Sequence, residues 1–172
     1  MLKKILLFFL IFTSQNLTAY EITLDDLRIL LGNWTKLVPV GAYDFVPEEV
    51  TYEIYSDKKF QEKLKIAAEK LNKKINESKI KLAGYMVPVE MKKGKVSKFL
   101  LVPEAGQCIH VPPPPLNQTV LVEMEDKLAE EVNIYKPIIV SGSINVGSNS
   151  FDVADSGYII TSAEVSTIKI KK

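Results

Sequence analysis

From Ile80 onward, apolar and polar residues alternate in short runs, and this alternation is the strongest constraint on the fold. A period of two residues is typical of half-buried β-strands. Ile80–Glu90 and Val96–Val102 are expected to form a hairpin, with Gly94 at the tight position of a turn over Met91–Gly94. Three more strands are predicted over Thr119–Met124, Pro137–Ile144 and Tyr158–Ile170.

Gly142 lies inside the fourth predicted strand, where a glycine permits a sharp bend. Five short strands with such a bend predict a mainly β (α+β) fold, with a five-stranded OB-like Greek-key barrel over residues 79–172. A twisted open sheet packed on a helix is the alternative. The alternation changes side near Ser166, which indicates a bulge or the end of pairing. We interpret Gly142–Ser150 as a hairpin connection and Asp126–Val132 as a short helix between strands.

Residues 20–78 have the spacing of helices instead. Thr23 followed by Asp26 is typical of a capping pair that begins a helix, and Gly32 would end that helix. A second helix is expected after a cap at Ser56 or Asp57. Its apolar stripe consists of Phe60, Leu64, Ala67, Leu71 and Ile75, and its other faces are rich in lysine with interspersed acids. These residues therefore predict a helical N-terminal arm, with a solvated lysine face, that packs on the barrel.

The first 19 residues have the order of a secretory signal peptide. Lys3 and Lys4 precede an apolar run over Ile5–Phe12, and polar and small residues follow up to Ala19. The run is shorter than the about 20 residues that a membrane-spanning helix needs. We therefore expect cleavage near Ala19, a periplasmic or secreted protein and no transmembrane segment after cleavage. An uncleaved membrane anchor is the alternative.

Charge and cysteine content narrow the classes of function. The net charge is +1 and Arg28 is the only arginine, so neither a positive field nor bidentate arginine contacts favour nucleic-acid binding. Cys108 is the only cysteine, so the chain cannot form an internal disulfide. A single thiol in an oxidising compartment is usually buried, bound to metal or paired between chains.

Cys108 stands two residues from His110, the only histidine. Side chains two apart on an extended segment face the same side, and a thiolate with an imidazole suits zinc or copper. Two ligands do not complete a zinc site, so Glu104, Gln107, Asn117, Gln118 or a second molecule would have to contribute, and amides are poor zinc ligands. Two alternatives stand beside this hypothesis. Cys108 is a small buried hydrophobe with His110 as a hydrogen-bonded pin, or the pair belongs to a thiol-dependent enzyme or redox protein.

The motif runs directly into four prolines. Proline fixes an extended polyproline II backbone that is rigid before a ligand arrives. This segment could present a ridge to the aromatic groove of a partner, or it could be a stiff crossover between strands. Asn117 and Gln118 are expected to bond the carbonyl groups of the loop, because proline supplies acceptors without donors. The partner-binding hypothesis comprises Pro112, Pro113, Pro114, Pro115, Asn117 and Gln118.

The segments GYMVPVE, FLLVPEAGQCIHVPPPPLNQTV and IIVSGSI resemble a family of bacterial exported proteins known as a domain of unknown function. The resemblance covers about the last 95 residues, and a looser similarity extends to NWTKLVP. It implies a periplasmic or lipid-anchored protein, which in some members is encoded near export-type or metal-uptake transporters, and no established activity. No cysteine follows the apolar run at the N-terminus, so the lipid-anchor attachment point is absent from this sequence.

Together these features predict an exported, non-enzymatic envelope binding module, an accessory in transition-metal handling through its Cys-x-His-Pro loop. A thiol-dependent enzyme or redox protein and a structural partner of an envelope transporter complex are the alternatives.

Overall fold

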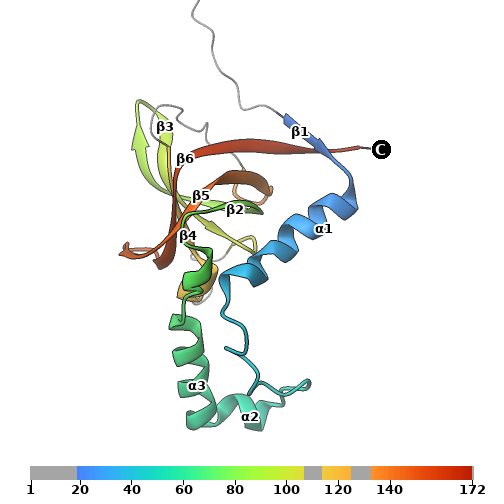
Figure 1. Cartoon of the computed structure of the whole chain (residues 1–172), viewed down its shortest axis with the longest axis vertical. Helices are drawn as coiled ribbons and strands as arrows, with labels where there is room; N and C mark the ends of the chain where they lie inside the picture. The colour runs from blue at the N-terminus through green and yellow to red at the C-terminus, as the bar shows by residue number, and fades with distance from the viewer. Residues whose placement is uncertain (1–18, 107–113, 125–132, 172) are drawn as a thin grey trace, which may run out of the picture.

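The computed structural model describes residues 19–106, 114–124 and 133–171 (Figure 1). These residues form a β-sheet, and the α-helices lie in the N-terminal part of the chain, between β1 and β2. The strands are β1 (Ala19–Ile22), β2 (Ser78–Lys92), β3 (Lys95–Val102), β4 (Val120–Glu123), β5 (Ile138–Ser150) and β6 (Asp155–Ile170). The α-helices are α1 (Leu24–Gly32), α2 (Tyr52–Ser56) and α3 (Lys58–Glu69). The short 3-10 helices are η1 (Asn33–Leu37), η2 (Lys73–Ile75) and η3 (Leu116–Gln118).

The strand pairings lead from β2 through β3, β4, β6 and β5 and back to β2. All of these pairs are antiparallel except β4 with β6, which is parallel. β1 adds to the edge of the sheet, parallel to β6. The prediction of a mainly β fold preceded by helices is confirmed.

The five strands predicted from Ile80 onward correspond to β2–β6, but the expectation that they are short is wrong, because β2, β5 and β6 contain 15, 13 and 16 residues. The sheet of the described residues also has a sixth strand, β1, which was not predicted. β1 was not predicted from the sequence, because it has only four residues and begins at Ala19, where the signal peptide was expected to end. Four residues are too few to display a period of two.

The hairpin between β2 and β3 follows the prediction. Lys93 and Gly94 connect the strands with positive φ angles of 51° and 74°. The two-residue hairpin turn that matches the twist of the flanking strands requires positive φ at both residues. Glycine adopts this conformation at no steric cost. A local signal was therefore sufficient to place this turn.

The prediction of a hairpin connection over Gly142–Ser150 is wrong, because β5 continues to Ser150 and residues 151–154 lead to β6. Register shifts near Gly142 and after Val146 let the long strand bend while it pairs with β6. At Gly142 a Cβ atom would lie 2.6 Å from Cγ2 of Ile160, so the close approach of two strands explains this glycine. The predicted change near Ser166 corresponds to an end of pairing, since β6 leaves β5 at Thr167 and pairs with β1 from there.

The helix caps are confirmed. Thr23 and Asp26 form a reciprocal capping box at α1, and the Asp57 side chain accepts a hydrogen bond from Phe60 N at α3. The predicted apolar stripe extends beyond the end of its helix. α3 ends at Glu69, while Leu71 and Ile75 pack against the main core from the segment that follows.

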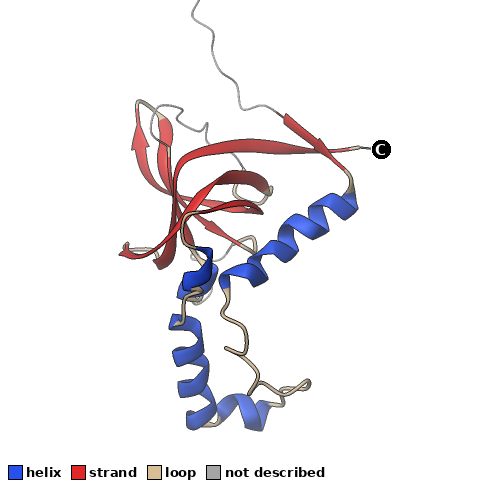
Figure 2. Ribbon diagram, viewed as in Figure 1, coloured by secondary structure: helices blue, strands red, loops and turns tan. Residues whose placement is uncertain are grey.

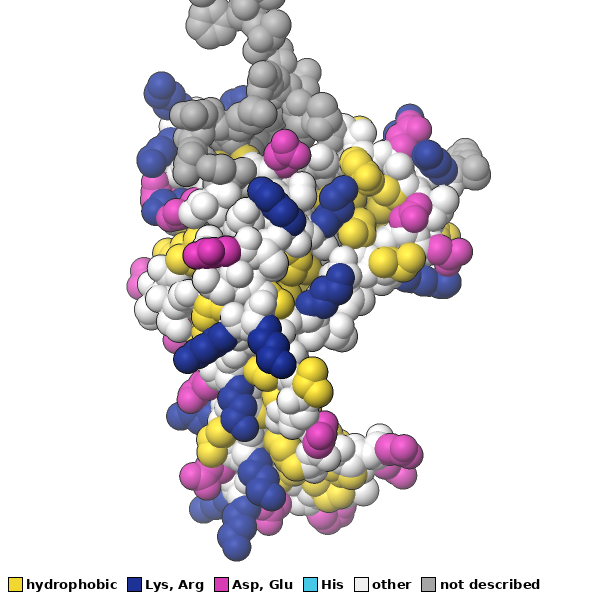
Figure 3. All heavy atoms as spheres, in the orientation of Figure 1, with side chains coloured by type: hydrophobic (Ala, Val, Ile, Leu, Met, Phe, Trp, Pro, Cys, Tyr) yellow, Lys and Arg dark blue, Asp and Glu magenta, His cyan; other side chains and the backbone are white. Residues whose placement is uncertain are grey.

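Two helical regions differ in their relation to the sheet. Leu27, Leu30 and Leu31 of α1 pack on a cluster formed by Ile22, Ala83 and Ile139. α2 and α3 instead extend away from the sheet (Figures 1 and 2), and Ala67 is their only buried residue. We call α2 and α3 together the α2–α3 unit. Lysine side chains follow α3 in the space-filling view (Figure 3), in keeping with the predicted solvated face.

Candidate functional site

The loop that carries the predicted site joins β3 to β4. Leu101 of β3 and Val120 of β4 are paired, so residues 103–119 leave and re-enter the sheet at one place. GYMVPVE lies on β2 directly beside this exit, because Tyr85 pairs with Val102. GYMVPVE and the start of the loop are therefore neighbours in the sheet. Val102 and Val120, at the two ends of the loop, are fully buried.

The NWTKLVP segment lies against the same strands. Trp34 is buried, and its Nε1 donates a hydrogen bond of 2.7 Å to the carbonyl oxygen of Ala83. A Cβ atom at Gly84 would lie 3.1 Å from Cζ2 of Trp34 and 2.7 Å from the carbonyl oxygen of Val102. Gly84 therefore lets the indole and the start of the loop approach β2 closely.

The C-terminal end of the loop is held by hydrogen bonds. The carbonyl oxygen of Pro115 accepts bonds from Gln118 N at 2.8 Å and from Thr119 Oγ1 at 3.0 Å. Pro114 is buried and Pro115 is exposed, while Thr119 is fully buried. A short 3-10 turn thus fixes the approach to β4.

Asn117 is fully buried and ties the loop to α3. Its Nδ2 donates to the carbonyl oxygens of Ala67 and Lys70 at 2.9 and 3.1 Å, so it satisfies carbonyl groups at the end of that helix. Gln118 Nε2 donates to the carbonyl oxygens of Trp34 at 3.4 Å and Asn117 at 3.1 Å. Among the described residues of the loop, the Gln118–Asn117 bond alone matches the expectation that both amides bond carbonyl groups within the loop. Because the side chain of Asn117 is fully buried, it positions the loop and has no surface to offer a partner.

Tyr158 of β6 joins two segments behind this loop, and sequence reasoning missed it. Its fully buried hydroxyl donates to the carbonyl oxygen of Leu37 and accepts a bond of 2.7 Å from Asn72 N. Burial raises the pKa of Tyr158, and the bond from Asn72 lowers it by less. Leu37 belongs to NWTKLVP. The looser family similarity of that segment was therefore the sequence signal that could have pointed to this contact.

The predicted ligands are placed only in part. Glu104 is exposed on the N-terminal side of the loop, two residues after β3 ends. Cys108, His110, Pro112 and Pro113 lie outside the described residues, as does the helix predicted over 126–132. Within the described ranges no three His, Cys, Asp or Glu residues gather in a way that could hold a metal ion. In the same ranges, no helix is long and apolar enough to cross a membrane.

Comparisons with known proteins give a family and a fold. The family described as "Protein of unknown function (DUF3299)" matches residues 34–167, from Trp34 into β6. The crystal structure of a DUF3299 family protein from Pseudomonas aeruginosa PAO1 is similar, with 29% sequence identity and a TM-score of 0.61. The similarity covers 90% of this chain and 99% of that chain. No curated protein matches. Since the matched range includes residues 34–39 of NWTKLVP, both strands beside the loop and the loop itself, the chain belongs to the DUF3299 family of proteins of unknown function.

Proposed function

We propose that this protein is an exported, non-enzymatic binding module of the bacterial envelope that presents the loop over residues 103–119 from an OB-like Greek-key barrel. The cyclic order of strand pairing, with β4 parallel to β6, supports the barrel. The apolar run over Ile5–Phe12 supports export through a signal peptide cleaved near Ala19.

One observation carries the binding role, namely the fixed frame at both ends of the loop. The loop leaves from buried Val102 and returns through an Asn117 side chain that bonds α3. Ends fixed in this way reduce the entropy that the loop loses when it binds a ligand. The tetraproline segment adds stiffness from its sequence alone.

The specific role that we propose is transition-metal handling beside an envelope transporter. Cys108 and His110 would supply a thiolate and an imidazole, which suit zinc or copper, and the carboxylate of Glu104 would supply an oxygen ligand. Glu104 is exposed at the N-terminal side of the loop, which is compatible with this role.

Metal analysis of protein never exposed to chelators or to nickel resin tests this proposal. We expect about one zinc or copper ion per chain, or one per two chains, because structural zinc needs four ligands. Cys108→Ala and His110→Ala should abolish binding, and Glu104→Gln should weaken it. Glu48→Gln is the matched control, since Glu48 is an exposed carboxylate near the α2–α3 unit.

Three results would contradict the metal role, and each has a different meaning. Metal-free protein whose melting temperature falls in His110→Ala would make the motif architectural. A Cys108 thiol that alkylating agents modify far faster than a buried thiol would favour an enzyme or redox protein. Metal-free protein that copurifies with an envelope complex would favour a structural partner.

A further inference from the structure

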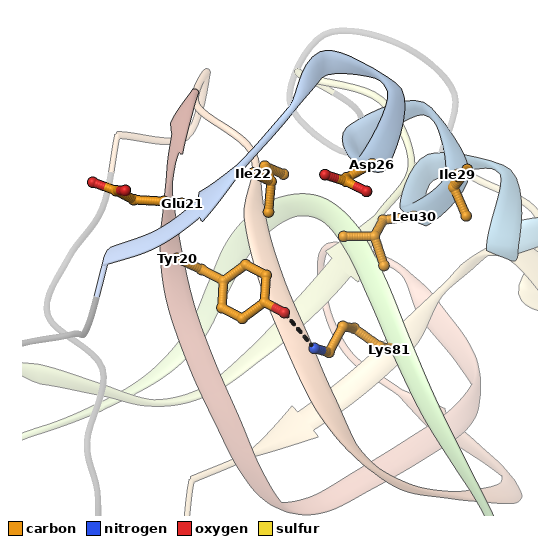
Figure 4. Close-up of a pocket in the computed structure, with 7 residues that line it drawn as sticks. All are labelled: Tyr20, Glu21, Ile22, Asp26, Ile29, Leu30 and Lys81. Atoms are coloured by element: carbon orange, nitrogen blue, oxygen red, sulfur yellow. Dashed lines mark hydrogen bonds between the residues drawn. The ribbon is translucent and has the colours of Figure 1, made fainter. Parts of the chain in front are cut away.

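A hollow of about 230 Å³ lies between β1, α1 and β2, on the part of the sheet that carries β1. It is lined by Tyr20, Glu21 and Ile22 of β1, by Asp26, Ile29 and Leu30 of α1, and by Lys81 of β2 (Figure 4). Predicted cleavage after Ala19 would leave all seven residues in the chain. None of the described lining residues belongs to the loop over residues 103–119, so the proposed metal role leaves the hollow unexplained.

The hollow exposes backbone as well as side chains. Three consecutive residues of a strand cannot all point one way, because side chains alternate between faces. The carboxylate of Glu21 forms an ion pair of 2.8 Å with Lys169 and points away from the hollow (Figure 4). Glu21 must therefore contribute main-chain atoms. β1 is the last strand in the order of the described sheet, so β6 covers only one of its edges.

A cation is held at one side of the hollow. Lys81 Nζ lies 4.5 Å from the ring centroid of Tyr20 and donates a hydrogen bond of 3.3 Å to its hydroxyl. Lys81 is half-buried, and none of the ion pairs found among the described residues includes it. The ammonium of a half-buried lysine that joins none of these described ion pairs favours an anionic group on a ligand.

The rest of the lining limits what else the ligand can carry. Ile22 is buried and Leu30 half-buried, and both continue into the apolar cluster under α1. Asp26 lies at another part of the rim, and both hydrogen bonds from Thr23 reach its Oδ2. These bonds hold the pKa of Asp26 below its usual value, so it is a carboxylate that repels a second negative charge. The ligand therefore combines one anion with an apolar body.

We propose that this hollow binds a short extended peptide with a free C-terminal carboxylate and an aliphatic side chain. The carboxylate pairs with Lys81, the side chain rests on Ile22 and Leu30, and the peptide backbone lies along β1 near Glu21. Addition of an extended segment to a sheet edge is a common mode of peptide recognition. The volume is below the roughly 300–1,000 Å³ of pockets for drug-sized ligands, so a dipeptide is the fitting size.

Titration of the dipeptide Ala-Leu into isotopically labelled protein, followed by NMR, tests the proposal. Amide shifts are expected at Tyr20, Glu21, Ile22 and Lys81. Ala-Leu amide, which lacks the negative charge, should bind about tenfold more weakly, the loss of one charge-assisted contact. Lys81→Met should weaken Ala-Leu binding by a similar factor. This variant should bind Ala-Leu and Ala-Leu amide equally, because the substitution and the amidation remove the same contact.

Two controls separate this result from a change of fold. Lys79→Met removes an exposed lysine of the same strand that does not line the hollow, and it should bind as the wild type does. Ile29→Asp adds a second negative charge at an exposed position of the rim and should weaken binding. Absence of shifts at β1 and Lys81 with Ala-Leu would overturn the proposal, as would equal affinity of wild type and Lys81→Met. Metal content does not enter this test, so it can fail while the proposed metal role stands.

Discussion

The sheet and the α2–α3 unit are held in place by different means. The sheet encloses a core whose largest fully buried side chains include Tyr158, Phe99, Leu82 and Met86. The α2–α3 unit buries only Ala67, and its aromatic contact joins Phe60 to Phe45 with ring centroids 5.8 Å apart. Apolar burial therefore fixes the sheet, whereas a few directed contacts position the α2–α3 unit. Replacing single residues can test this difference.

The largest expected effect is in the sheet. Phe99→Ala removes a fully buried ring and should lower the free energy of unfolding by about 3–5 kcal/mol. Phe60→Ala removes a half-buried ring from α3 and should cost about 1–2 kcal/mol. Urea denaturation of both variants measures the two losses. Equal losses would show that the α2–α3 unit contributes to the core as fully as the sheet does.

Asn117→Ala should sharpen the comparison, since this side chain joins the two regions. It removes both donors from the carbonyl oxygens of Ala67 and Lys70, at an expected cost of about 1–3 kcal/mol. Hydrogen exchange should accelerate in α3 more than in β3 or β5. Asn33→Ala is the matched control, because Asn33 Nδ2 makes a similar bond of 2.9 Å to the carbonyl oxygen of Lys81. Faster exchange throughout the sheet in Asn117→Ala would mean that the amide supports the whole fold.

The smallest effect concerns pH. The pKa of Tyr158 is raised in the folded protein, so its stabilising contribution is present below the ordinary tyrosine pKa of about 10. This contribution is lost as the pH rises through the folded pKa. Tyr158→Phe should cost about 1 kcal/mol at neutral pH and should make the alkaline loss of stability shallower. Tyr135→Phe, at a side chain that is 64% exposed, should retain the wild-type pH dependence. Parallel pH profiles for wild type and Tyr158→Phe would contradict this assignment.

The same contrast explains what could be predicted from the sequence. Caps at Thr23 and Asp57 and the turn at Lys93 and Gly94 depend on residues within one turn of each other, so local chemistry decides them. The full length of β5 was missed because its glycines and serines usually indicate a connection. Here pairing with β2 and β6 overrides that preference.

The candidate site was predictable to a lesser degree. The sequence placed the loop between two strands, and the structure has it there. The role of Asn117 depends on the end of α3, about 50 residues earlier, and that approach has no local signal. Cys108 and His110 remain a prediction, whereas the hydrogen bonds of Tyr158 to Leu37 and of Trp34 to Ala83 join segments that are distant in the sequence and had no local signal.

The exchange of partners along β6 also bears on the order in which the chain can fold. β6 pairs with β1, β4 and β5, and the Glu21–Lys169 ion pair spans 148 residues of sequence. Contacts of such separation form slowly, since loop closure must precede the gain from pairing. The β2–β3 hairpin can form locally, but the edges of β1 and β4 stay open until residues 155–170 are available. In the export that we propose, most of the chain would emerge from the membrane before its sheet could close, and the open edges of β1 and β4 would then need protection from pairing with other chains.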